Sequence, residues 1–299
     1  MAVVLAYRAL GLGDFLTGVP AYRALARGFP DHEIVLAAPA ALAPLAALTG
    51  AIDRVVDTAP LGPAPRGADV AVNLHGRGPQ SHRVLSRARP DRLIAFGLNG
   101  IEWHPREHEV VRWCRLLEEA GIPADPSELD IDPPGVPNPA PPNATVIHPG
   151  AASPARRWPA ERWAAVARAE REAGRPVVIT GSAGERELAA SIDPHALVLA
   201  GRTDLVGLAA TVAGAGRLVC GDTGVAHLAS AVGTPSVVLF GPTPPDEWGP
   251  PPGRPQHRAL WAGRRGDPHG REPDPGLLEI TVADVLDALR TVPVGSPGS

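Results

Sequence analysis

Two rounds of alternating strand-like and helix-like segments are the feature that most constrains the fold of this chain. Short runs rich in valine, isoleucine and leucine alternate with stretches rich in alanine, leucine and arginine. Strands that alternate with helices predict βα units built around parallel sheets. Between the two rounds, residues 132–143 hold six prolines in twelve positions and fit neither a helix nor a central strand. The sequence therefore predicts two Rossmann-like domains with a proline-rich linker.

The predicted domains span residues 1–139 and 142–278, and residues 279–299 add a last helix and a flexible tail. Two facing lobes of this kind leave a cleft beside the carboxyl ends of both sheets, where ligands bind. The expected strands are Val3–Tyr7, Glu33–Ala37, Arg54–Asp57, Val70–Leu74, Arg92–Phe96, Thr145–His148, Pro176–Thr180, Ala196–Leu199, Arg217–Cys220 and Ser236–Phe240, with Arg258–Trp261 as a further candidate. The expected helices are Phe15–Arg27, Glu107–Ala120, one from about Pro159, Gly184–Ser191, Leu205–Ala213, Gly224–Val232 and Val282–Arg290.

The composition excludes several classes of protein. With 44% hydrophobic and 20% charged residues, the chain is expected to fold into globular domains. Its net charge of −4 gives no broad attraction for nucleic acid or for an acidic membrane, so any anion has to be bound locally. All 28 basic residues are arginine, so a phosphate would be met by guanidinium groups, helix amides or hydroxyls.

Cysteine use and hydropathy favour a cytoplasmic location. Cys114 and Cys220 lie far apart in apolar runs, which fits neither a disulfide framework nor a metal-ligand cluster. No basic residues precede the first apolar run, and no uninterrupted apolar stretch reaches the roughly 18 residues of a membrane helix. Neither a signal peptide nor a membrane span is therefore expected.

The strongest functional signal is the segment RLVCGDTGVAHLASAVGTPSVVLFGPT, which spans Arg217–Thr243. It puts Asp222, Thr223 and Gly224 where a strand becomes a helix, so the Thr223 hydroxyl and the free helix amides can bind a diphosphate. The alternative is that Asp222 or Thr223 only caps the helix. His227 follows one turn later and is expected to face the same site, with simple packing as its alternative role.

The second signal is the loop HPGAASPARRWPAERW over His148–Trp163. Its small residues, Gly150 and Ala151 among them, leave room for phosphate oxygens. Arg156 or Arg157 is placed to supply the positive charge that stabilises a departing nucleoside diphosphate. Ordinary solvated arginines are the alternative.

Glu185 begins the helix that follows a small-residue turn at residues 181–184. A carboxylate there fits binding of a ribose. It fits equally well a favourable interaction with the helix dipole.

In the first domain, the segment YRALGLGDFLTGVPAYRAL puts a glycine turn and Asp14 between the first strand and the first helix. Gly11 and Gly13 match the first two positions of a dinucleotide fingerprint, but Leu16 stands at the third and no carboxylate ends the second strand. Asp14 is instead expected at the tip of the turn, where an ionised carboxylate with an ordinary pKa can take a proton from an attacking hydroxyl. Its alternative role is the N-cap of a helix that starts at Phe15.

Polar residues also follow the fourth strand of the first domain. His75, Arg77 and Gln80 lie at its carboxyl end and suit the hydroxyls of an acceptor sugar, beside Gly13 of the first turn. A glycine-rich turn with a solvated Arg77 is the alternative.

Together these segments resemble glycosyltransferase family 9, the ADP-heptose:lipopolysaccharide heptosyltransferases and their relatives. The marks are GLGDFLTGVPAYRAL, HPGAASPARRWP and above all GDTGVAHLASAVGTPSVVLFGPT, and the resemblance runs nearly end to end. It implies the GT-B fold, with the last helix crossing back toward the first domain. It also implies Asp14 as catalytic base, with donor contacts from Arg156, Glu185, Thr203, Asp222, Thr223, Gly224 and His227. Many relatives have lysine where Arg156 stands, which keeps the charge but changes the hydrogen-bonding geometry.

The expected function is transfer of a heptose or related sugar from a nucleotide sugar to a saccharide or other hydroxyl acceptor. The resemblance to the family implies that the donor is ADP-linked. Inversion at the anomeric carbon and independence of metal and of any other cofactor are expected. The first domain carries no long basic amphipathic segment, so at most peripheral membrane association is expected. Two alternatives stay open, namely an NAD(P)-dependent oxidoreductase and a non-catalytic nucleotide-sugar-binding protein. The sugar, the base, the acceptor and the oligomeric state also stay open.

Overall fold

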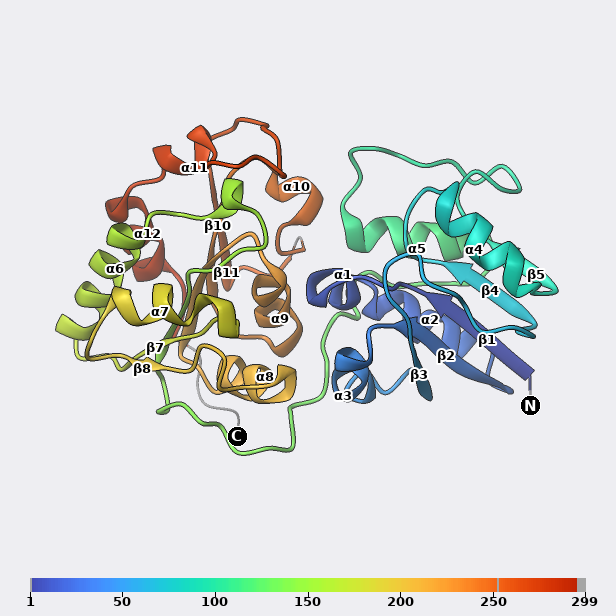
Figure 1. Ribbon diagram of the computed structural model, residues 1–299, viewed down its shortest axis with the longest axis horizontal. Coiled ribbons are helices and arrows are strands. Elements are labelled where there is room, and N and C mark those ends of the chain that lie inside the picture. The colour runs from blue at the N-terminus through green and yellow to red at the C-terminus, as the bar shows by residue number, and fades with distance from the viewer. Residues whose placement is uncertain (1, 252, 295–299) are drawn as a thin grey trace. The chain divides into compact units, whose positions relative to one another are not determined.

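Each half of the chain forms one parallel β-sheet with helices packed against it (Figure 1). The structure is a computed structural model that describes residues 2–251 and 253–294. The chain divides into two compact units after Asp132, at the start of the proline-rich stretch. The predicted α/β class with two parallel sheets is confirmed.

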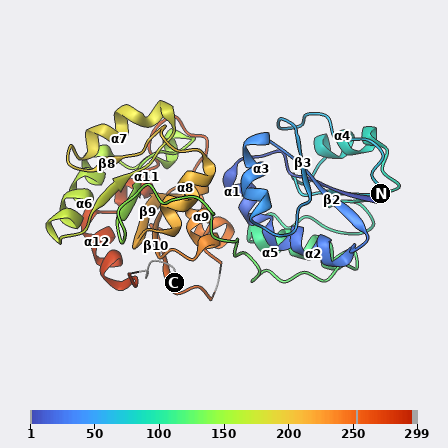
Figure 2. The same ribbon diagram turned by 90° about the horizontal axis from the view of Figure 1, so that it is seen from below.

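The first sheet has the strand order β3-β2-β1-β4-β5. Its inner strands are nearly continuous apolar runs, as expected when both faces of a parallel sheet are covered. Leu5 and Tyr7 of β1 pack with Leu85 of α4, whereas α2 and α5 lie on the opposite face (Figure 2). The elements are β1 Ala2–Tyr7, α1 Leu12–Thr17, α2 Val19–Gly28, β2 His32–Ala38, η1 Ala40–Leu42, α3 Ala43–Ala47, β3 Arg54–Asp57, β4 Val70–Asn73, α4 Gln80–Ala88, β5 Arg92–Ile94 and α5 Glu109–Glu119.

The second sheet has six strands in the order β11-β10-β9-β6-β7-β8. Trp163 and Val166 of α6 and Leu289 of α12 share one buried cluster with Val219 and Leu239 of the central strands. The elements are β6 Thr145–His148, η2 Pro154–Arg156, α6 Ala160–Glu172, β7 Val177–Ile179, η3 Ala183–Glu185, α7 Arg186–Ile192, β8 Leu197–Val198, α8 Leu205–Ala213, β9 Arg217–Gly221, α9 Gly224–Val232, β10 Ser236–Phe240, α10 Pro245–Trp248, β11 His257–Trp261, α11 Pro275–Glu279 and α12 Val282–Thr291.

The helix expected over Phe15–Arg27 is in fact two helices, α1 and α2, which meet at Gly18. Pro20 lies in the first turn of α2, where no helical hydrogen bond needs its missing N–H. Inside one continuous helix, Pro20 would remove a backbone hydrogen bond of the helix. Tyr22 fills the space beside Gly18, so a side chain at this junction would clash with its ring. The break lets α1 begin three residues earlier than expected.

Four short helices were not expected from the sequence: α3, α4, α10 and α11. The most consequential is α4, because the segment after β4 was interpreted as a glycine-rich turn and Gln80 is instead the first residue of a helix. Within the described residues, no helix is long and apolar enough to cross a membrane.

The last helix, α12, completes the second domain. Val285, Ala288 and Leu289 are buried in the core cluster of that domain, and α12 packs against α6 and β10. The apolar face of α12 is used by the second core, and its crossing back toward the first domain stays a prediction.

Both sheets reverse their direction of growth beside their first strand, between β1 and β4 and between β6 and β9. Outside the carboxyl ends of two such strands the following loops diverge, which leaves the crevice where parallel sheets bind ligands. The segments after these four strands contain most of the predicted functional residues.

Candidate active site

In the second domain, the reversal point brings the loop after β6 against the end of β9. The loop carbonyl of Arg156 lies so close to Gly221 that a Cβ there would be 3.1 Å from it. The Arg156 guanidinium donates from Nη1 to the Asp222 carbonyl at 3.2 Å and lies 3.7 Å from the Asp222 carboxylate. Arg156 and Asp222, distant in sequence, are thus neighbours at the start of α9.

Two polar atoms at this place are buried without a hydrogen-bond partner in the described part of the chain: Arg156 Nε and Thr223 Oγ1. Thr223 is the N-cap of α9, yet its side chain makes no capping hydrogen bond. The alternative that Thr223 only caps the helix is therefore wrong. Buried polar groups in folded proteins nearly always have partners, so this pair, beside the free amides of α9, fits a ligand with several acceptor oxygens.

Asp222 is an unusual neighbour for such a ligand. Its side chain is buried, and desolvation raises its pKa to about 6 although the positive charge of Arg156 acts to lower it. An anion bound nearby would change the charge around this carboxyl and so shift its protonation.

Glu185 lies on the other side of the loop after β6. Its carboxylate accepts hydrogen bonds from Ser182 N at 2.7 Å and Ser182 Oγ at 2.8 Å, which closes a capping box. Burial alone would raise the pKa of Glu185, but these bonds and the nearby His148 and Arg157 lower it. Glu185 therefore has a local structural role as part of a capping box, which the helix-dipole alternative did not include, and its carboxylate also lies against Gly150.

Of the remaining predicted donor-side residues, Ala151 is buried, and its carbonyl accepts from Arg157 Nε at 2.9 Å. Thr203 is half-buried just before Asp204, the N-cap of α8. His227 is half-buried on α9, and its ring lies 6.0 Å from that of Trp248 on α10. Trp248 was missed because α10 was not expected.

In the first domain, Asp14 lies in the first turn of α1, and Gly11 is the N-cap. Both the turn-tip position and the capping alternative are thus wrong for Asp14, because the helix starts at Leu12. The side chain of Asp14 is 30% exposed and lies 3.6 Å from the guanidinium of Arg8. Burial raises its pKa and Arg8 lowers it, with the net effect upward, so the ordinary pKa expected from the sequence is also corrected.

The acceptor-side candidates differ in burial. The backbone N–H of His75 donates to Asn73 Oδ1 at 3.2 Å, and its ring packs on Tyr7. Burial lowers the pKa of His75 to about 4, so the ring is neutral at pH 7, and its Nδ1 is buried without a partner among the described residues. Arg77 and Gln80 are exposed, and Gly13 lies inside α1.

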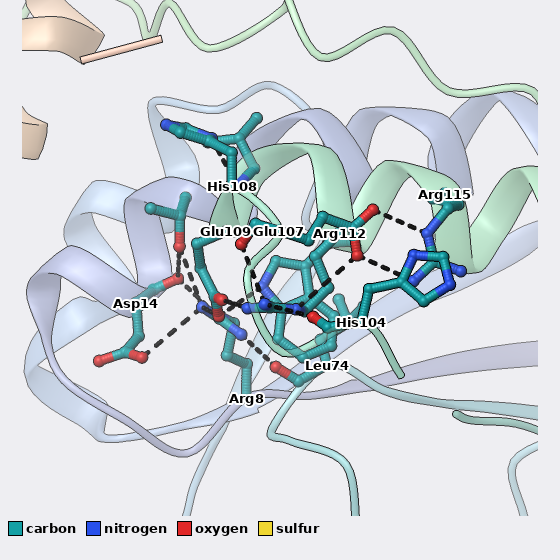
Figure 3. Close-up of polar contacts among 12 residues, drawn as sticks. Arg8, Asp14, Leu74, His104, Glu107, His108, Glu109, Arg112 and Arg115 are labelled. Carbon is teal, nitrogen blue, oxygen red and sulfur yellow. Dashed lines mark hydrogen bonds and ion pairs between the residues drawn. The ribbon is translucent and has the colours of Figure 1, made fainter. Parts of the chain in front are cut away.

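No local sequence pattern indicates the buried charges that lie around Asp14 (Figure 3). Arg8 at the end of β1 contacts Asp14, and it also contacts Glu109 of α5, which pairs with Arg112. The available signal was an arginine directly after a buried apolar strand. Its partner lies about a hundred positions further on, which no local pattern can reveal. In the described ranges 2–251 and 253–294, no group of three or more His, Cys, Asp or Glu side chains is placed to hold a metal ion.

Comparison with known sequences decides the family. The profile of glycosyltransferase family 9 (heptosyltransferase) matches residues 89–275, more than half of the chain. The chain belongs to glycosyltransferase family 9. The resemblance inferred from its sequence motifs is thereby confirmed, and membership of this family disfavours the oxidoreductase alternative.

One curated relative of this family member is lipopolysaccharide heptosyltransferase 1 of Pseudomonas aeruginosa, with 49% identity over 69 residues. That segment is 22% of this chain and 19% of the relative, so the match spans only about a fifth of the relative's length.

Solved structures match the family 9 chain over nearly its whole length. The ADP-heptose lipopolysaccharide heptosyltransferase II of E. coli has a TM-score of 0.75 and 22% identity, covering 96% of this chain and 97% of that one. A family 9 glycosyl transferase from Veillonella parvula has a TM-score of 0.76 and 19% identity, covering 97% and 96%. E. coli heptosyltransferase WaaC with ADP-2-deoxy-2-fluoro heptose has a TM-score of 0.72 and 18% identity. That match covers 96% of this chain and 98% of the WaaC chain. At these identities the likeness establishes the fold, which is GT-B as expected.

Proposed function

We propose that this family 9 member transfers a heptose or a related sugar from an ADP-linked donor to a hydroxyl of a saccharide acceptor. The observation that carries the proposal is the pair of unpartnered buried atoms, Arg156 Nε and Thr223 Oγ1, beside the amino end of α9. Among the solved relatives, WaaC has been determined with ADP and with an ADP-linked fluoro-heptose, which supports the same donor class here.

The donor diphosphate is held by the α9 amides, the Thr223 hydroxyl and the Arg156 guanidinium. Gly224 lets the backbone approach the phosphate oxygens, and Glu185 and Thr203 are placed for the ribose side of the nucleotide. His227 and Asp222 lie near the sugar. Guanidinium and helix dipole then stabilise the charge of the departing ADP, so no metal ion is required for this step.

Asp14 is the general base. Its carboxylate removes the proton of the acceptor hydroxyl while that oxygen forms a bond to the anomeric carbon of the donor. The bond from the anomeric carbon to the phosphate oxygen breaks, and ADP leaves with its electron pair, so the configuration inverts in one displacement. Burial of Asp14 raises its pKa, which makes the carboxylate a stronger base than an exposed aspartate.

The acceptor binds to the first domain, where Gly13, His75, Arg77 and Gln80 accompany Asp14. Neutral His75 can offer its unpartnered Nδ1 to a sugar hydroxyl. We propose a cytoplasmic reaction with peripheral contact to the membrane at most, and the free, buried Cys114 and Cys220 support this location.

The test uses the whole chain in EDTA. Calorimetry with ADP, GDP and UDP should give the tightest binding for ADP, and Arg156→Ala should weaken it by about 1 to 3 kcal/mol because a charge-assisted contact is lost. Arg168→Ala is the matched control, since Arg168 is an exposed arginine of α6 and lies outside the loop after β6. ADP release from ADP-heptose in the presence of saccharide acceptors then reports turnover. Strict metal dependence would overturn the proposed site, and tight ADP binding without turnover would favour the non-catalytic alternative.

A further inference from the structure

Arg8 occupies a central position in the first domain although it touches no solvent. Its side chain is 0% exposed. Its Nε donates to the Asp14 carbonyl, its Nη1 to the Leu74 carbonyl and its Nη2 to Thr17 Oγ1 at 2.9 Å. One side chain therefore ties the segment after β1, which carries Asp14, to the segment after β4, which carries His75.

Arg8 is itself held from the side of α5. Its Nη2 donates to Glu109 Oε1 at 3.2 Å, and its guanidinium lies 4.6 Å from the centre of the Trp113 ring. Glu109 also accepts from Trp113 Nε1 at 3.0 Å and from Arg112 Nη1. Trp113 covers a face of the guanidinium and its donors are engaged, so Arg8 is held in place from several elements.

The charges form an alternating row from Asp14 through Arg8 and Glu109 to Arg112 (Figure 3). Arg112 is held in place, because its Nη2 donates at 2.9 Å to the backbone carbonyls of His104 and Glu107, and its Nε lies 3.9 Å from the Glu107 carboxylate. Glu109 thus divides its negative charge between two arginines, and Arg8 divides its positive charge between two carboxylates.

The charged and titratable groups that face Asp14 come from three elements. Arg8 comes from the end of β1 and Glu109 from α5, and the buried Tyr22 hydroxyl comes from α2. His75, after β4, faces Arg8 and stays neutral near pH 7. Burial raises the pKa of Asp14 most, Arg8 lowers it, and Glu109 raises it.

We propose that Arg8 is a positioning residue for Asp14, and that Glu109 sets how strongly the charge of Arg8 acts on that carboxylate. Arg8 has no exposed surface with which to touch a substrate, so it acts through the carboxylate and through the two segments that it joins. The inference rests on the proposed role of Asp14 as the base.

The experiment removes one charge at a time from this row. Glu109→Gln keeps an oxygen that can accept from Arg8 but removes the negative charge. Asp14 should then ionise more easily. The acidic limb of the profile of kcat against pH should therefore move to lower pH by about 0.5 to 1 unit. Arg8→Met removes the positive charge, so the acidic limb should move to higher pH. The value of kcat should also fall roughly 10²-fold, because Asp14 loses its position. Arg8→Lys should restore the limb but not kcat, because an ammonium cannot span both carbonyls.

The matched control is Glu118→Gln. Glu118 is an exposed carboxylate near the other end of α5, so this variant should leave the acidic limb in place. ADP affinity should be unchanged in every variant, since the residues proposed to bind ADP lie in the other domain.

A carbon-13 titration of the Asp14 carboxyl gives the same answer without any turnover. It should show a lower pKa in Glu109→Gln and a higher one in Arg8→Met. If the pKa stays in place in Glu109→Gln or moves upward, the proposal is overturned, and this holds even if Arg8→Met fails to fold. If the carboxyl titrates as expected but the wild-type chain turns over no nucleotide sugar, the proposed function fails and the electrostatic arrangement stands.

Discussion

The carboxylate of Glu185 lies directly against Gly150, in the space where a side chain at position 150 would begin. The backbone of Gly150 does not require glycine, since its φ is not positive. Glycine is needed at position 150 because a Cβ there would overlap the Glu185 carboxylate. Two residues predicted separately as donor contacts are therefore one unit, in which the loop after β6 supports the carboxylate that begins the segment after β7.

Gly150→Ala should displace Glu185 from its capping box with Ser182. We expect ADP affinity to fall as much as it does in Glu185→Gln, by roughly 10-fold, because a charged hydrogen-bonding group is lost. Calorimetry on both variants and on the double variant measures this, and the double variant should be no worse than Glu185→Gln alone. Gly184→Ala is the control, since a Cβ there meets nothing closer than Ser182 Oγ at 3.9 Å. Additive losses in the double variant would contradict the coupling.

Thr223→Val should weaken ADP binding by roughly 10-fold and leave the free energy of unfolding unchanged or raised by up to about 1 kcal/mol. The reason is that Thr223 Oγ1 is buried without a partner in the described part of the ligand-free chain, so its removal costs the fold nothing. Thr211→Val is the opposite case, because Thr211 Oγ1 donates to the Gly207 carbonyl at 2.7 Å. That variant should lose stability and keep ADP affinity. Urea unfolding and calorimetry measure both, and equal behaviour of the two variants would count against a ligand role for Thr223.

The pKa of Asp222, about 6, predicts that donor binding tightens as the pH falls from 8 to 5. Protonation removes a negative charge next to the bound diphosphate, which should improve affinity by about three- to tenfold. A nucleotide sugar is the right ligand, because its bridging diphosphate does not titrate in this range. The dependence should be absent in Asp222→Asn.

The same residue links pH to stability. The folded pKa lies above the unfolded value, so this group contributes stability below about pH 4 that is lost as the pH rises through 6. Asp222→Asn should therefore be more stable than the wild type at pH 8, by about 1 to 3 kcal/mol, and equal to it at pH 4. If Asp222→Asn is instead less stable than the wild type at pH 8, the Asp222 carboxylate is ionised and fully hydrogen-bonded in the folded chain.

Asp14→Asn should lower turnover by roughly 10²-fold or more and leave ADP affinity nearly unchanged, because the amide cannot accept the proton of the acceptor. Steady-state kinetics with an identified acceptor measures the effect. Asp69→Asn is a suitable control: Asp69 accepts from Val3 N at 2.6 Å at the amino edge of the same sheet, away from the strand ends that carry the site. Wild-type turnover in Asp14→Asn would move the search for the base to His75.

The framework of the fold was predictable because buried parallel strands are apolar runs with clear ends. The strands Arg54–Asp57, Thr145–His148 and Ser236–Phe240 have the boundaries that the sequence indicated. The polar, arginine-containing helix Gln80–Ala88 was missed, since it follows a glycine- and proline-rich stretch typical of a turn and buries few residues.

The candidate site was predictable only in its local parts. Strand-to-helix turns with Asp222–Gly224 or Arg156 follow from short motifs. The contact of Gly150 with Glu185 and that of Arg8 with Glu109 depend on how distant segments pack. The pKa of Asp14 depends on burial, which a motif does not specify, and so its raised value was not foreseen.

The division of the chain after Asp132 also bears on how such enzymes diverge. The proposed base and acceptor contacts all precede this boundary, and the proposed nucleotide contacts all follow it. Mutations that alter the choice of acceptor can therefore accumulate in one half without disturbing the recognition of ADP in the other. Recombination at the proline-rich stretch would then exchange a whole acceptor preference in a single event.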